Sequence, residues 1–243
     1  MTDGESKAEK LAQELREQFN ELAELAGSLA HEIKNPLSVI QMNMDLLAED
    51  FADSETPEER RALAKIEIVQ KQCTRLDTLL RDFLKFARLR DLKLSPGSLN
   101  EIVGRVLDFF QRQADEAEIR FIRFLDPALP SIKLEEQTLY AALMNLVKNS
   151  LEAMPDGGQL VARTRMTRHG VALDLIDTGH GMDNETALKM FDAFYSTKGG
   201  GSGLGLPTAR KIFEAHGGRI NVQSEVGRGT QFTIEFPQPA RIQ

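Results

Sequence analysis

The segment AHEIKNPL, residues 30–37, lies in the middle of a long helical pattern and places a histidine five residues before a proline. Apolar residues on both sides of it recur at steps of three, four or seven, as on one face of an α-helix. They are Leu11, Leu15, Leu22, Leu25, Leu29, Ile33, Leu37, Ile40, Met44 and Leu47. Because this run is longer than an ordinary globular helix, it predicts a bundle or coiled-coil helix over about residues 8–52.

A second helix is predicted after the loop DSETPEER, residues 53–60. Thr56 can cap it, Pro57 suits the first helical position, and the two following glutamates favour the positive end of the helix dipole. Its apolar stripe consists of Ala62, Ile66, Val69, Cys73, Leu76, Leu80, Phe83 and Ala87. A helical hairpin alone leaves each stripe half covered, so pairing of two hairpins into a four-helix bundle predicts a homodimer.

The segment LSPGSLNE, residues 94–101, marks a boundary to a region of mixed pattern. Pro96 and Gly97 are expected to stop the helix, and Ser98 with Glu101 resembles a capping box for the next one. We therefore expect an N-terminal helical domain over residues 8–92 and a second domain over residues 98–238.

The second domain reads as an α+β sandwich. We expect strands at 118–124, 159–166, 171–177, 219–224 and 230–236, and helices at 139–154 and 204–216. Short turns between consecutive strands predict an antiparallel or mixed sheet with helices packed on one face. The expected fold class is therefore α+β, with a long helical hairpin that forms a dimeric four-helix bundle, followed by an α/β sandwich.

Composition and charge exclude several classes of protein. The net charge of −7 argues against a nucleic-acid partner. Cys73 is the single cysteine, so an intrachain disulfide is impossible. No stretch approaches the roughly 20 apolar residues of a membrane span, and the acidic N-terminus is unlike a signal peptide. We expect a cytoplasmic chain; the sequence leaves open whether it derives from a longer, membrane-anchored parent.

Two glycine-rich segments point to an anion site. DTGHGM, residues 177–182, follows a predicted strand, and GGGSGLGL, residues 199–206, leads into a predicted helix. Backbone N–H groups at a helix N-terminus attract phosphate, but each loop by itself is explained equally well as a flexible turn. No Walker motif is present, because no Gly-Lys-Ser/Thr follows. Together the two segments bracket what we interpret as a mobile lid.

Two asparagines share one face of the predicted helix 139–154. Asn145 and Asn149 are four residues apart, and asparagines on an otherwise apolar helix are costly unless they bind something. Neutral amide oxygens suit Mg²⁺ that is held chiefly by the phosphates of a nucleotide. Capping or solvated side chains are the alternative interpretation.

Six motifs in chain order carry a family resemblance: HEIKNPL, NLVKNSLEA, DTGHGM, FDAFYSTK, GGGSGLGL and GRGTQF. From about residue 8 to 238 the chain resembles the catalytic core of a two-component sensor histidine kinase. That core joins a dimerisation and phosphoacceptor domain to an ATP-binding domain of the gyrase, Hsp90, histidine kinase and MutL type. HEIKNPL together with GLGL most resembles the nitrogen-regulator subclass.

The resemblance implies ATP-dependent autophosphorylation and transfer of the phosphate to an aspartate in the receiver domain of a response regulator, with a regulator phosphatase activity beside it. It implies that His31 is the phosphoacceptor, that Glu32 is its acidic partner, and that Asn35 serves the phosphatase reaction. On a helix of about 100° per residue, His31 falls opposite the apolar stripe. Asn35 falls one turn from His31, and Pro36 cannot donate to the Glu32 carbonyl, so we expect a bend there.

The resemblance also assigns residues to Mg²⁺ and ATP. Asn149 matches the metal ligand, with Asn145 close to it, and Asp177 matches the carboxylate that accepts from the adenine amino group. Lys148 and Lys198 are assigned to phosphate contacts, and Thr230 to a water-mediated contact with adenine. Gly179 and Gly181 are assigned to close approach of the backbone to the nucleotide. The loop that closes over the triphosphate is assigned to Gly201, Gly203, Leu204 and Gly205. Ala193 departs from the proline that is common there, and the lid is short, which weakens the assignment of Lys198 in particular.

Three alternatives remain open at this point. A clamp ATPase of the same superfamily would carry a glutamate base where Asn145 stands and would lack HEIKNPL. A non-catalytic dimeric scaffold is disfavoured by the intact asparagines, Asp177 and glycines. A protein that works mainly as a regulator phosphatase is compatible with every motif.

Overall fold

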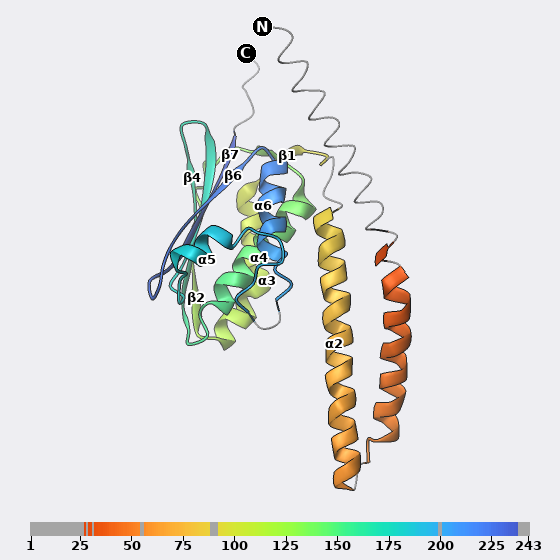
Figure 1. Cartoon of the computed structure of the whole chain (residues 1–243). Coiled ribbons are helices and arrows are strands. Elements are labelled where there is room, and N and C mark those ends of the chain that lie inside the picture. The colour runs from red at the N-terminus through yellow and green to blue at the C-terminus, as the bar shows by residue number, and fades with distance from the viewer. Residues whose placement is uncertain are drawn as a thin grey trace. The chain divides into compact units, whose positions relative to one another are not determined.

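The computed structural model describes residues 27, 29–30, 32–53, 56–87, 92–198 and 201–237. The chain divides into two compact units, residues 1–88 and 89–243, and each is described by itself (Figure 1). The part of the predicted first helix before residue 27 lies outside the described residues. So does His31.

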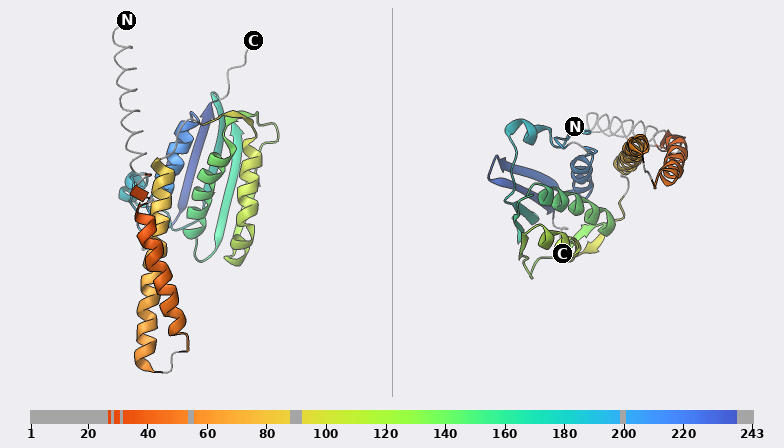
Figure 2. Two further views of the ribbon diagram at one scale, coloured as in Figure 1. Left: turned by 90° about the vertical axis from the view of Figure 1, so that its right-hand side faces the viewer. Right: turned by 90° about the horizontal axis from the view of Figure 1, so that it is seen from below.

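The first unit is a helical hairpin. Residues 32–50 are helical, and they are followed by α2, Pro57–Ala87, which runs alongside them (Figures 1 and 2). Gln70 Nε2 donates to Asp45 Oδ1 at 2.7 Å and joins the two helices. The predicted start of α2 is confirmed: Glu59 N–H donates to Thr56 Oγ1 at 3.2 Å, and Thr56 N–H donates to Glu59 Oε2 at 2.9 Å.

The hairpin covers its apolar stripes only in part. Leu37 on the first helix and Ile66 and Cys73 on α2 are buried. Other stripe residues remain between 39% and 57% exposed: Leu29, Ile33, Ile40, Leu47, Val69 and Leu76. Apolar side chains at helical spacing therefore stay uncovered in the single chain.

The second unit contains a five-stranded sheet of order β2-β4-β5-β7-β6. Its strands are β2 (Ile119–Phe124), β4 (Gly158–Met166), β5 (Gly170–Asp177), β6 (Arg219–Glu225) and β7 (Gly229–Pro237). β2 pairs with β4 in parallel, and all other pairs in this sheet are antiparallel, so of the two predicted forms, antiparallel or mixed, the sheet is mixed.

Helices cover one face of this sheet. They are α3 (Leu99–Glu116), α4 (Glu136–Glu152) and α6 (Gly205–Ala215), seen on the same side in Figures 1 and 2. Alternate strand residues such as Leu173, Leu175 and Ile234 join the apolar faces of the helices in one core. The opposite face of the sheet carries polar side chains. The predicted sandwich with helices on one face is confirmed.

Three short elements were not predicted. β1 (Ser95–Gly97) pairs antiparallel with β3 (Ile132–Leu134), where a helix stop and an unassigned segment were expected. Gly97 faces Leu134 so closely that a Cβ there would lie 2.8 Å from Leu134 Cδ1. The third element is α5 (Asn184–Lys189), which lies within the segment interpreted as a lid.

The predicted helix 139–154 begins earlier than expected. The Glu135 carboxylate accepts from Thr138 N–H at 2.8 Å and acts as the N-cap, so α4 starts at Glu136. The predicted N-cap of α3 is confirmed, because Ser98 Oγ accepts from Glu101 N–H at 3.3 Å. Within the described ranges, none of the helices is long and apolar enough to cross a membrane.

Candidate functional site

Asp177 is the centre of the candidate site. It ends β5 beside Thr230 of β7, and it is only 3% exposed. Its Oδ1 accepts from Gly179 N–H at 3.0 Å and from Thr230 N–H at 3.1 Å. Its Oδ2 accepts from the Ser150 hydroxyl of α4 at 3.0 Å. Three donors from three different elements therefore fix the orientation of one buried carboxylate.

The electrostatics of Asp177 reflect two opposing effects. Burial raises the pKa of this carboxyl group above its ordinary value, because the charged form loses its hydration. The hydrogen bonds from Gly179 N–H, the Ser150 hydroxyl and Thr230 N–H lower it, but they do not cancel the burial. A buried, preorganised acceptor of this kind is suited to a donor group on a ligand.

Gly179 and Gly181 flank His180 in the loop after β5, and internal packing already requires both glycines. A Cβ on Gly179 would lie 2.7 Å from the Ala153 carbonyl oxygen at the end of α4. Gly181 has φ +66°, and a Cβ there would collide with the Glu225 carbonyl in the β6–β7 turn. The family resemblance gave nucleotide approach as the reason for these glycines. Close contact with α4 and with the β6–β7 turn is a further reason for them, and the approach to the nucleotide stays a prediction.

The two asparagines of α4 lie on one side of the helix, as predicted, and both are half-buried. Asn145 Nδ2 donates to the Gly205 carbonyl at 3.2 Å, which ties α4 to the start of α6. Asn149 Oδ1 accepts from the Lys198 ammonium group at 3.1 Å. The same ammonium group also contacts the Glu152 carboxylate. The structure thus brings Lys198 to Asn149 across 49 residues of sequence.

The second glycine-rich segment packs tightly where the structure describes it. Gly203 has φ +67°, and a Cβ there would overlap the Phe194 backbone, whose N–H donates to the Gly203 carbonyl at 3.0 Å. At Gly201 a Cβ would lie 2.7 Å from Ser196 Oγ. Leu204 is fully buried and precedes α6 without supplying a side-chain cap. The first turn of α6 therefore offers backbone N–H groups of the kind that bind anions.

Lys148 lies on the exposed side of α4, with its ammonium group 3.8 Å from Glu152 Oε1. Glu152 therefore has two lysines beside it, Lys148 and Lys198. Of the two, Lys198 also contacts Asn149. The predicted contact of both lysines with phosphates stays a prediction.

The candidate phosphoacceptor segment belongs to the other unit. Glu32 and Asn35 are exposed on the helix of residues 32–50, and Leu37 after Pro36 is buried. His31 falls outside the described residues, so the predicted contact between His31 and Glu32 stays a prediction.

Sequence reasoning missed Ser150. Its side chain is 2% exposed, in a run of apolar residues that face the sheet. A hydroxyl on the buried side of a helix needs a partner, and that requirement was the available signal. The partner itself, Asp177, lies 27 residues further along the chain.

Two family models match the chain. Residues 134–240 match the histidine kinase-, DNA gyrase B- and HSP90-like ATPase family, and residues 21–92 match the His Kinase A (phospho-acceptor) domain. Sporulation kinase C of Bacillus subtilis is 29% identical over 230 residues, which are 94% of this chain and 52% of that protein. The sensor histidine kinase ZraS of Klebsiella oxytoca is 32% identical over 223 residues, 91% of this chain and 47% of that protein. The chain thus spans about half of these relatives.

Solved structures of histidine kinases are also similar to this chain. Full-length ShkA in complex with AMPPNP superimposes with a TM-score of 0.70 at 28% identity, covering 88% of this chain and 45% of that chain. Histidine kinase ThkA in complex with the response regulator protein TrrA gives a TM-score of 0.65 at 26% identity, covering 94% of this chain and 65% of that chain. With its phospho-acceptor domain and its ATPase domain, this chain belongs to the histidine kinases and carries their catalytic core.

Proposed function

We propose that this chain transfers the γ-phosphoryl group of ATP to His31, and then from His31 to an aspartate in the receiver domain of a response regulator. The observation that carries the proposal is the buried Asp177, fixed by three donors at the end of β5, in a chain that also has a phospho-acceptor domain. In the first step a ring nitrogen of His31 bonds to the γ-phosphorus while the bond to the leaving ADP oxygen breaks.

Nucleotide binding is assigned to the second unit. Asp177 accepts a hydrogen bond from the exocyclic amino group of adenine, and Thr230 supports this contact through its bond to Oδ1. The phosphates are assigned to the N-terminus of α6 and the loop through Gly201, Gly203, Leu204 and Gly205, with Lys198 and Lys148 beside them. Phosphoryl transfer depends mainly on alignment and charge neutralisation, which is what these groups offer.

The side chains of α4 fit Mg²⁺. Asn149 Oδ1 already accepts from a cationic group, and Asn145 turns its amide nitrogen to Gly205, which leaves its oxygen for a ligand. Within the described part of the chain, no cluster of three or more histidines, cysteines and carboxylates could hold a metal, so phosphate oxygens would supply most of the ligands. Bound Mg²⁺ would neutralise the developing negative charge on the phosphates.

On the helical unit, we assign to Glu32 the task of fixing the tautomer of His31, so that the other ring nitrogen keeps its lone pair. Asn35 is assigned to the phosphatase reaction, in which its amide would hold a water at the aspartyl phosphate of the regulator. We place the chain in the nitrogen-regulator subclass on the forms HEIKNPL and GLGL, and we propose domain limits of 8–92 and 98–238.

We further propose that the chain acts as a homodimer in the cytoplasm. The exposed apolar residues of the hairpin support the dimer, because burial of such a stripe against a second hairpin completes a four-helix bundle. Among the rival functions, a clamp ATPase is disfavoured by Asn145 at the position of a glutamate base and by the phospho-acceptor domain.

The test is incubation with γ-labelled ATP, followed by acid and base treatment of the protein. The expected product is a phosphoramidate, which is labile in acid and stable in base. His31→Gln should abolish the label while ATP binding survives. A label that persists in His31→Gln, or that withstands acid, would contradict the proposal.

A further inference from the structure

We propose that Ser150 is a positioning residue that makes the nucleotide site select adenine over guanine, acting through Asp177. The inference rests on the proposed function, because it concerns the same nucleotide. It extends that function by naming the residue that decides which base is accepted.

The geometry begins with the lone pairs of Asp177. An ionised carboxylate has about four lone-pair sites. The described residues occupy three of them: Gly179 N–H and Thr230 N–H both bond Oδ1, and the Ser150 hydroxyl bonds Oδ2 at 3.0 Å. One site on Oδ2 is left for a ligand, and its direction is set by the bond from Ser150.

This remaining site distinguishes the two purines. Adenine presents an amino donor at C6, whereas guanine presents a carbonyl acceptor at C6. An ionised carboxylate oxygen accepts from the amino group and repels the carbonyl. Discrimination therefore depends on two properties of Asp177, namely its charge and its orientation.

Ser150 supports both properties. Burial opposes ionisation of Asp177, and the hydroxyl of Ser150 stabilises the charged form by hydrogen bonding. Without it, the pKa of Asp177 would rise further, and the protonated carboxyl group could donate to the guanine carbonyl. The two N–H groups hold only Oδ1. Without the bond from Ser150, the carboxylate group can therefore rotate about its Cβ–Cγ bond, and the direction of Oδ2 is no longer fixed.

Several titratable and charged groups lie on the elements around Asp177 and can affect its ionisation. His180, in the loop after β5, favours the charged form of Asp177. On the neighbouring elements lie Lys148 and Glu152 of α4, Asp156 before β4, and Glu225 and Arg228 of the β6–β7 turn. Glu225 and Arg228 pair with one another at 2.8 Å. None of these residues changes in the variants below, so they contribute equally to every comparison.

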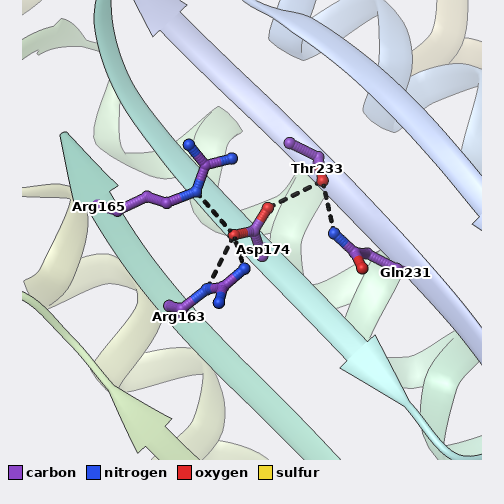
Figure 3. A network of polar contacts seen from close by, with 5 residues as sticks. All are labelled: Arg163, Arg165, Asp174, Gln231 and Thr233. Atoms are coloured by element: carbon purple, nitrogen blue, oxygen red, sulfur yellow. Dashed lines mark hydrogen bonds and ion pairs between the residues drawn. The ribbon is translucent and has the colours of Figure 1, made fainter. Parts of the chain in front are cut away.

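The chain offers a matched control, Asp174, on the other face of the same strand. Figure 3 shows Asp174 with Arg163, Arg165 and Thr233 around it. Asp174 is fully buried, and Thr233 Oγ1 donates to its Oδ1 at 2.8 Å. Its Oδ2 accepts from Arg163 and Arg165 at 2.9–3.1 Å. Burial opposes ionisation here too, but hydrogen bonds from Arg165, Thr233 and Arg163 hold the pKa of Asp174 below its ordinary value. Thr233→Ala therefore removes the same kind of bond as Ser150→Ala, from a buried aspartate outside the nucleotide site.

The experiment measures the affinities of Mg–ATP and Mg–GTP by calorimetry across pH 5–8, together with thermal stability, for the whole chain. Ser150→Ala should reduce the ATP-to-GTP affinity ratio by about tenfold, the size expected for loss of a hydrogen bond to a charged group. On acidification, the ATP affinity of Ser150→Ala should begin to fall at a higher pH than the ATP affinity of the wild type. Ser150→Thr, which keeps the hydroxyl, should restore the ratio. Ser150→Cys, a weaker donor of similar size, should give an intermediate ratio and serves if the alanine variant does not fold.

Thr233→Ala should lower stability and leave the ratio unchanged. A Ser150→Ala protein with lower stability but an unchanged ratio and pH profile would overturn the inference, because Ser150 would then be purely structural. Wild-type protein that binds neither nucleotide would overturn the proposed function itself. The two failures are therefore distinguishable.

Discussion

The ammonium group of Lys198 donates a hydrogen bond to Oδ1 of Asn149 at 3.1 Å. The oxygen that we assign to Mg²⁺ therefore already holds a cation supplied by the chain. Glu152, three residues further along α4, contacts the same ammonium group and helps to keep it there. A second cation at this oxygen would be repelled by the ammonium group, so we expect Lys198 to move from Asn149 toward the phosphates when Mg–ATP binds.

Glu152→Gln should ease this exchange. Removing the carboxylate charge weakens the hold on Lys198, so the Mg²⁺ concentration that gives half-maximal ATP binding should fall severalfold. This midpoint is measured by titrating Mg²⁺ and following the binding of a fluorescent ATP analogue. The control is Glu116→Gln, which breaks the Arg112–Glu116 pair of 3.0 Å on α3 and should leave the midpoint unchanged. A higher midpoint in Glu152→Gln would contradict the competition.

Asn149→Asp should weaken Mg–ATP binding by about tenfold or more, because a charge is placed beside the polyphosphate and strengthens the contact with Lys198. Calorimetry gives the affinity, and autophosphorylation gives the activity. Asn221→Asp adds the same charge at an exposed position of β6 and should change neither. Unchanged affinity together with normal activity in Asn149→Asp would remove Asn149 from the metal site.

Asp177→Asn should increase the stability of the fold relative to wild type as pH rises, while it removes nucleotide binding. The pKa of Asp177 is raised by burial in the folded state, so the stabilisation of its neutral form is complete at low pH and is lost as pH rises through the folded-state pKa. The variant does not ionise, and its melting temperature relative to wild type should rise with pH across the acidic range. The melting temperature should change by about 2–4 °C for each 1 kcal/mol of difference in the free energy of unfolding.

ATP binding by Asp177→Asn should be lost at every pH, because Gly179 N–H and Thr230 N–H hold the amide oxygen and the amide nitrogen then faces the adenine amino group, donor against donor. Thermal melts at pH 4–8 with and without nucleotide test both statements. A relative melting temperature that falls with rising pH would show that the ionised carboxylate stabilises the fold.

Asn35→Ala should keep substantial autophosphorylation and lose most of the regulator phosphatase activity. Attack by His31 needs a lone pair and an aligned γ-phosphate, whereas regulator dephosphorylation needs a water held beside His31, one turn from Asn35. The measurement is the decay of the phosphorylated regulator, compared with its own decay without kinase. Asn43→Ala is the control, because the Asn43 amide donates to the Val39 carbonyl of its own helix at 2.8 Å. Decay at the wild-type rate with Asn35→Ala would reduce Asn35 to a solvated side chain.

Leu76→Glu should dissociate the proposed dimer. Leu76 is 52% exposed in the single chain, and a charge there would be buried without a partner in a four-helix bundle. Light scattering should report twice the chain mass for the wild type and the chain mass for the variant. Leu188→Glu, on α5, replaces a leucine that is 83% exposed and should remain dimeric. A monomeric wild type at micromolar concentration would contradict the assembly.

Most of the helices and strands of this protein, though not β1, β3 and α5, follow from local patterns in its amino-acid sequence. Apolar spacing predicted the hairpin helices, Thr56 and Ser98 marked two helix starts, and alternation predicted the strands of the main sheet. These features depend on residues within a few positions of one another, so periodicity and side-chain caps contain the necessary information. The family motifs likewise pointed to Asp177 and to the asparagines of α4 as the chemical groups of the site.

The partners of these residues follow from tertiary packing alone. Ser150 and Asp177 are 27 residues apart, Asp177 and Thr230 are 53 apart, and Lys198 meets Asn149 across 49 residues. The pairing of β1 with β3 is equally non-local. No local pattern records such contacts, because they form only when helices and strands pack around a common core and bring distant side chains within hydrogen-bonding distance. The sequence therefore named Asp177, Asn149 and Lys198 as candidates, and packing decided which partners these side chains have and added Ser150.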